Sequence, residues 1–148
     1  MRNVIAIVGA VLLAACSGGS TATPEERIDE FNQRLDAADY DAIWQSTAAE
    51  FKEVVTRDEF ALMLESAHEA LGDFESAQTI STEETEIDGM QFVEVHQLVT
   101  YENDEADVSF RFKRDDLSLA SWHIDCNLVL DEYLRRQRLA EEGAAATE

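Results

Sequence analysis

The spacing of the hydrophobic residues changes near the middle of the chain, from the period of a helix to the period of a strand. Ile28, Phe31 and Leu35 recur at helical intervals, and a second helical stripe begins at Phe60. From Phe74 onward, apolar residues alternate with polar ones. Helices followed by consecutive antiparallel strands indicate an α+β domain, with the helices on one side of a curved sheet of about four strands.

Three helices are expected before the sheet. Residues 23–26 combine a capping box with a proline at the first helical position, and the helix that they begin is expected to run to about Ala38. A second helix is expected to start at Asp39, followed by a less regular turn at residues 51–55. The capping box recurs at residues 56–59 and begins a third helix that Gly72 ends.

Strands are predicted at residues 74–87, 90–101, 108–113 and 118–128. Asp88-Gly89 is a strong hairpin signal between the first two. In the second strand, alternation separates an apolar face from a mixed one; the two sets are Val93, Val95, Val99 and Tyr101 against Phe92, Glu94, His96, Leu98 and Thr100. A short charged helix is expected at residues 131–142.

The first residues have the composition of a secretory signal. Arg2 precedes an apolar run at residues 4–12 that is too short and wrongly flanked to be an ordinary membrane-spanning helix. The run ends in Leu13-Ala14-Ala15-Cys16, which a Gly/Ser stretch follows, and this motif resembles the lipobox of bacterial lipoproteins. The resemblance implies removal of the signal before Cys16 and acylation of that cysteine, which holds the protein to the lipid bilayer.

The motifs divide the chain into four parts. Residues 1–15 are the expected lipoprotein signal peptide, 16–24 the lipidated cysteine and flexible tether, 25–130 the α+β domain, and 131–148 a charged helix with a frayed tail. Ser17 stands where an aspartate signals inner-membrane retention in enterobacterial lipoproteins. The resemblance therefore implies an outer-membrane protein that faces the periplasm.

The chain is strongly acidic, with 32 Asp and Glu against 11 Lys and Arg and a net charge of −21. A field of this sign repels nucleic acid and favours basic partners, although an acidic surface also serves solubility alone. The one basic cluster is Arg135, Arg136 and Arg138. These arginines are expected to pair with Asp131 and Glu132 of their own helix.

Several segments together resemble the nuclear transport factor 2-like fold, and more narrowly its uncharacterised lipoprotein members. They are residues 35–44, Phe51-Lys52, Phe60, Leu71-Gly72 and residues 121–125. The resemblance covers roughly residues 25–128 and rests on core and turn residues. It implies a cone-shaped domain whose concave sheet face can hold a pocket, which different members use for catalysis, binding or dimerisation. Fold alone does not choose among these uses.

Candidate catalytic residues come from the sheet face that such a cone would enclose. His96 could act as a general base, with Glu94, Tyr40 or Tyr101 to orient it or to donate a proton. His68 is expected to be a surface residue. In so acidic a chain, a histidine often lies near a carboxylate by chance. Catalysis is therefore not the favoured function.

No cofactor or metal is predicted. The acidic turn at residues 104–107 lacks the glycine and the closing glutamate of a calcium loop, and the histidines lack the spacing of a zinc site. Cys126 has no second cysteine to pair with once Cys16 is lipidated. Strict alternation places Cys126 on one strand face with Trp122 and Ile124, which predicts a small buried side chain.

The sequence favours a membrane-anchored module without enzymatic activity. Its expected partners are a small apolar ligand, another envelope protein, or a second copy bound through the sheet face. A small enzyme of the isomerase or dehydratase kind with His96 as base is an alternative, which the resemblance implies. An acidic inhibitor of a basic envelope or secreted partner is a second alternative.

Overall fold

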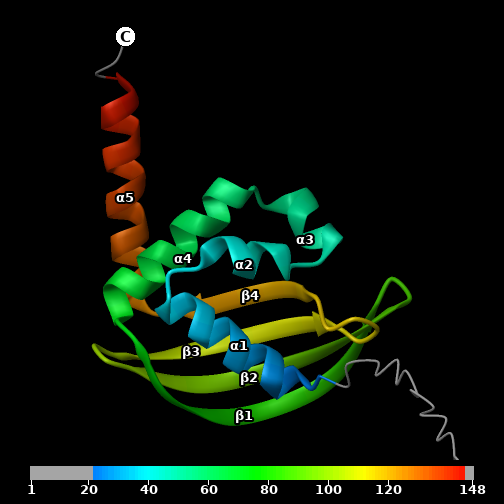
Figure 1. The fold of residues 1–148 in the computed structure, drawn as a ribbon. Helices are drawn as coiled ribbons and strands as arrows, with labels where there is room; N and C mark the ends of the chain where they lie inside the picture. Colours follow the sequence, from blue (N-terminus) through cyan, green and yellow to red (C-terminus); the bar gives the residue numbers. More distant parts are fainter. Residues whose placement is uncertain (1–21, 146–148) are drawn as a thin grey trace, which may run out of the picture.

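The computed structural model describes residues 22–145, which form a four-stranded sheet and five helices (Figure 1). The helices are α1 (Pro24–Asp36), α2 (Tyr40–Gln45), α3 (Ala49–Val54), α4 (Arg57–Leu71) and α5 (Asn127–Ala145). The strands are β1 (Phe74–Ile87), β2 (Met90–Tyr101), β3 (Glu105–Lys113) and β4 (Leu119–Asp125). The predicted α+β class is confirmed. The predicted signal peptide and Cys16 lie outside the described residues.

Both predicted capping boxes are present. The Thr23 hydroxyl accepts a hydrogen bond from the Glu26 amide at 3.2 Å, and the Glu26 carboxylate accepts one from the Thr23 amide at 2.9 Å. Thr56 and Glu59 repeat the arrangement at the start of α4. Each box satisfies amides that the first turn of a helix leaves without a partner, which fixes where α1 and α4 begin.

Four helices precede the sheet, whereas the sequence predicted three. The additional helix is α3, where an irregular turn was expected. It has six residues and only one of them, Phe51, is buried, so no repeated apolar spacing could reveal it. Phe51 packs edge-on against Phe60 of α4, with ring centroids 4.9 Å apart, and this contact holds α3 on the body.

The sheet is an antiparallel meander in the order β1-β2-β3-β4. Asp88 and Gly89 turn β1 into β2 as predicted, with φ of 52° and 80°. Figure 1 shows the helices α1–α4 over one face of the curved sheet. We call this the inner face, and the opposite one the outer face. The four apolar residues predicted to share a face of β2 are buried on the inner face.

Aromatic side chains fill the space between the helices and the inner face. Phe31 of α1 meets Phe110 of β3 at 5.2 Å between ring centroids, and Phe60 meets Trp122 of β4 at 6.1 Å, both edge to face. Phe60 and Phe110 are among the largest fully buried side chains. This core joins the helical and the strand halves of the chain.

The C-terminal end differs from the prediction in two ways. β4 ends at Asp125 instead of near Leu128, and α5 begins at Asn127 and spans 19 residues. The predicted domain boundary at residue 130 therefore falls inside α5. The run Leu128-Val129-Leu130 is apolar at each position, which suits a strand by composition, but Val129 is buried while its two neighbours are exposed. Among residues 22–145, no helix combines the length and the apolar character needed to cross a bilayer.

Gly72 and Gly89 allow a matched test of the junction between α4 and β1. Both have positive φ, of 75° and 80°, but a Cβ on Gly72 would lie 2.9 Å from Glu102 Cβ, whereas one on Gly89 meets nothing within 4 Å. We expect Gly89→Ala to lower the free energy of unfolding by about 1 kcal/mol through backbone strain alone. Gly72→Ala should lower it further in urea titrations, because the clash adds to the strain. Equal losses would contradict this account.

Candidate functional site

A mostly apolar cavity of about 470 Å³ lies between the end of β4 and the start of α5. Its apolar lining comes from three elements, α4, β4 and α5: Met63, Trp122, Ile124, Val129, Leu130 and Tyr133. Cys126 completes the lining, and its polar part comes from His123, Asp125 and Asn127. Small-molecule sites in proteins have this size and this mainly hydrophobic lining with few polar groups.

Trp122 connects the cavity to the core. Its side chain is only 5% exposed and packs against the rings of Phe31 on α1 and Phe60 on α4. The indole Nε1 is buried and has no hydrogen-bond acceptor among residues 22–145. A buried donor without an acceptor costs about 1–3 kcal/mol, and an acceptor that reached Nε1 would recover part of that energy.

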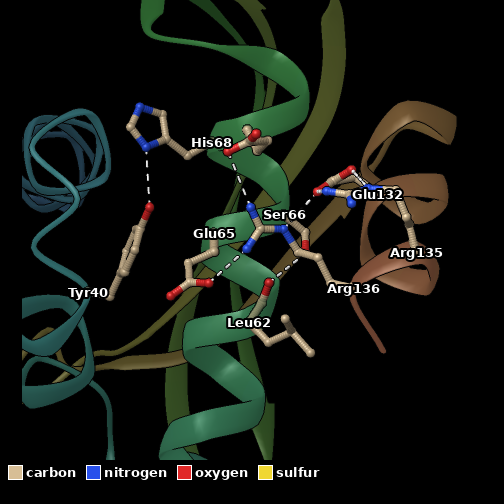
Figure 2. Close-up of polar contacts among 9 residues, drawn as sticks. Tyr40, Leu62, Glu65, Ser66, His68, Glu132, Arg135 and Arg136 are labelled. Carbon is tan, nitrogen blue, oxygen red and sulfur yellow. Dashed lines mark hydrogen bonds and ion pairs between the residues drawn. The ribbon is translucent and has the colours of Figure 1, made fainter. Parts of the chain in front are cut away.

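The wall of the cavity formed by α5 is held in place by Arg136, which bridges to α4. Figure 2 shows its guanidinium between the two helices. It donates to Glu65 at 2.9 Å and Glu69 at 3.2 Å, both on α4, and to Glu132 on its own helix at 2.7 Å. Arg135 and Arg136 pair with Glu132 as predicted, whereas Arg138 and Asp131 form no ion pair within residues 22–145. The bridge from Arg136 to α4 was not predicted.

Glu132 is shared by two arginines. Arg135 donates two hydrogen bonds to its carboxylate, at 2.7 and 2.6 Å. These bonds lower the pKa of Glu132 from 4.5 to about 2, with a further contribution from Arg136. Glu132 therefore stays ionised well below neutral pH and keeps its ion pairs with Arg135 and Arg136 within α5.

A second polar group joins α2, α4 and the start of β1. The Tyr40 hydroxyl lies 3.2 Å from Nδ1 of His68, and Nε2 of His68 lies 3.2 Å from the Asp73 carboxylate. Burial, with a smaller contribution from Glu65, raises the pKa of Tyr40, so its hydroxyl stays protonated and can donate to Nδ1. Figure 2 shows Tyr40 and His68 facing each other. Tyr40 is thus the partner of His68 and not of His96.

His96 lies on the outer face of β2, and the expectation that its face would line the interior of the fold is wrong. The inner face is set by the buried valines of β2, so alternation turns His96 outward, where its side chain is 47% exposed. Nε2 of His96 lies 3.2 Å from the Glu94 carboxylate, which also accepts two hydrogen bonds from Arg111. Glu94 and Arg111 form a partly exposed ion pair, and the His96 ring lies beside it.

Tyr101 lies on the inner face, away from His96. Its side chain is 4% exposed, and burial, followed by the charge of Asp36, raises its pKa. Phe74 packs edge-on against its ring, at 6.4 Å between centroids. The structure therefore pairs Glu94 with His96 but places Tyr40 and Tyr101 elsewhere, so these four predicted residues do not converge on one site.

Cys126 is the free cysteine of the described residues and is half-buried at the turn between β4 and α5. Together with Ile124 it packs against the core as predicted, but it lies just after β4 and is only partly buried. No group of three or more His, Cys, Asp or Glu side chains between residues 22 and 145 is arranged to hold a metal ion.

The family described as protein of unknown function (DUF3887) matches residues 29–120, more than half of the chain. The chain belongs to this family. No curated protein and no solved structure was found to match it. The DUF3887 match ends at Ala120, so it includes Met63 but none of the other residues that line the cavity. The cavity is therefore built mainly by residues that follow the matched part of the chain.

The site could be predicted only in part, because its decisive contacts join distant residues of this DUF3887 chain. Tyr40 and His68 are 28 positions apart, and Arg136 and Glu65 are 71 apart. One usable signal was overlooked. Val129, Tyr133 and Arg136 recur at intervals of four and three, which predicts one helix face that begins before residue 131.

The ion pairs of Glu132 with Arg135 and Arg136 within α5 should weaken in acid. Because the pKa of Glu132 is lowered from 4.5 to about 2, its stabilising contribution is complete above pH 4.5 and is lost as the pH falls through 2. Between pH 4.5 and pH 2, the free energy of unfolding should fall in both the parent and Glu132→Gln. We expect the fall to be about 1 kcal/mol larger in the parent, which is the size of the contribution of a solvated ion pair. Urea titrations at several pH values measure this.

Glu142→Gln is the matched control, since Glu142 lies on the same helix and is exposed. It should follow the parent profile. If Glu132→Gln followed it as well, the ion pair would not contribute to stability.

Proposed function

We propose that this DUF3887 protein is a lipid-anchored lipoprotein of the bacterial envelope, whose domain binds a small apolar ligand without catalysis. The observation that carries the proposal is the mainly apolar cavity between β4 and α5. Its volume of about 470 Å³ fits a small molecule.

The arrangement of the ionisable groups favours binding over catalysis. The space beneath the helices is occupied by packed aromatic rings, and the histidine predicted to act as a base lies on the exposed outer face beside an ion pair. General acid–base catalysis needs the base within hydrogen-bond reach of a substrate held in a pocket. His96 does line a hollow of about 520 Å³ on the outer face, but neither Tyr40 nor Tyr101 lies near it to complete such a site.

The lipid anchor is supported by the sequence, and the fold family by the arrangement of helices and strands. Leu13-Ala14-Ala15-Cys16 before a Gly/Ser stretch supports lipidation, and Ser17 supports an outer-membrane protein that faces the periplasm. Helices over one face of a curved antiparallel sheet support membership of the nuclear transport factor 2-like superfamily. Self-association through the sheet face and inhibition of a basic partner stay predictions.

The two cysteines provide a matched test of the anchor. Cells that express the protein and grow on labelled palmitate should incorporate label into the parent and into Cys126→Ser, but not into Cys16→Ser. Cys16→Ser should also leave the membrane fraction, since no acyl chain holds it there. Label in Cys16→Ser, or its absence from the parent, would refute lipidation at Cys16.

The cavity can be tested with Nile red, a neutral apolar dye, added to the Cys16→Ser chain so that no attached lipid binds the dye. Leu130 lines the cavity and Leu139 does not, although the two side chains on α5 are 55% and 53% exposed. We expect Leu130→Asp to weaken dye binding about tenfold, from the lost apolar contact and the added charge. Leu139→Asp should bind as the parent does, and a similar loss in both variants would place the dye elsewhere.

A further inference from the structure

One edge of β4 is covered only at its start. The Leu119 amide donates to the Ser46 carbonyl at 3.0 Å, and the Leu119 carbonyl accepts from the Ala48 amide at 2.8 Å. Beyond this point, no segment of the described chain pairs with the edge of β4 that faces away from β3. Residues 121–125 therefore present an unpaired strand edge, which is a template for another strand.

The apolar cavity runs along this same edge. It is lined by four successive residues of β4, of which Trp122 and Ile124 belong to the inner face and His123 and Asp125 to the outer face. Successive side chains of a strand point to opposite faces, so a cavity that meets all four must lie beside the strand. A second, more polar hollow of about 520 Å³ lies on the outer face and shares His123 and Asp125 with the first.

The outer side of this edge carries an uncompensated charge. Asp107 of β3 and Asp125 of β4 are directly paired across the two strands, and both are exposed. Neither side chain forms an ion pair or hydrogen bond with another residue in the described range 22–145. Like charges directly opposite each other destabilise a sheet, and a cationic side chain placed beside them would offset this repulsion.

We propose that residues 121–125 take up an extended basic segment of a partner protein as an additional antiparallel or parallel strand. Alternate apolar side chains of that segment enter the cavity between β4 and α5, and the basic side chains between them lie against Asp107 and Asp125. The inference rests on the proposed function, because the cavity is the same one. The net charge of −21 favours a basic occupant and opposes a second copy of this chain.

The test uses a seven-residue fluorescent peptide in which Lys and Leu alternate, with blocked ends, titrated into the Cys16→Ser chain and followed by anisotropy. Two control peptides carry backbone N-methyl groups, one on every Leu and one on every Lys. Amides of alternate residues in a strand point to opposite edges, so one control should bind about tenfold more weakly and the other should bind as the parent peptide does. Equal binding of both controls overturns strand addition.

The charge is tested separately. Asp125→Asn should weaken the Lys-Leu peptide about fivefold, whereas Asp88→Asn, in the turn at the far end of the sheet, should leave its affinity unchanged. A peptide with Glu in place of Lys should bind at least as weakly as the weaker of the two N-methylated control peptides. Binding of the Glu peptide as tight as that of the Lys peptide overturns the basic specificity.

Hydrogen exchange and the dye distinguish the remaining outcomes. The Lys-Leu peptide should slow amide exchange within residues 121–125. If these amides are already protected in a dimer without peptide, the occupant is a second copy and the proposal is overturned. If Nile red binds but no peptide does, strand addition is wrong while the ligand-binding function stands. If neither binds, both are wrong.

Discussion

The packing of helices against one face of the sheet determines where every other feature of this molecule lies. Phe31 of α1 packs against Phe110 of β3, and Phe60 of α4 packs against Trp122 of β4. Large aromatic side chains contribute more to such a contact than any other residues, both by area and by edge-to-face geometry. Once these rings are buried, alternation fixes the remaining side chains, and His123 must lie on the outer face beside the exposed edge.

The predictable parts of the fold are those that depend on residues close together in the chain. The capping boxes at Thr23 and Thr56, and the turn at Asp88-Gly89, each depend on a few consecutive positions, and all are found as predicted. Helix α3 was missed because one buried residue in six gives no period. The start of α5 was misassigned because Leu128-Val129-Leu130 suits a strand by composition, and only packing against α4 decides for a helix.

The site was predicted less accurately than the fold. The sequence shows which residues share a face of a strand, but it does not show which of the two faces is turned toward the helices. Alternation correctly separated His96 from Tyr101, but which side the helices cover depends on the whole core. The identity of polar partners is harder still. Tyr40 meets His68 and not His96 because α2 and α4 lie side by side on the inner face, a relation that no local pattern contains.

The scarcity of basic residues makes their placement informative. Arg136 joins two helices through three carboxylates, and Arg111 holds Glu94 on the outer face, so these cations are used where charges would otherwise repel. Asp107 and Asp125 face each other without such a cation at the open edge of β4. Unlike the junction of α4 and α5, where Arg136 neutralises crowded carboxylates, this pair lies without a cation beside an apolar cavity and an unpaired strand edge. That surface is where a partner would gain most by supplying both the missing strand and the missing charge.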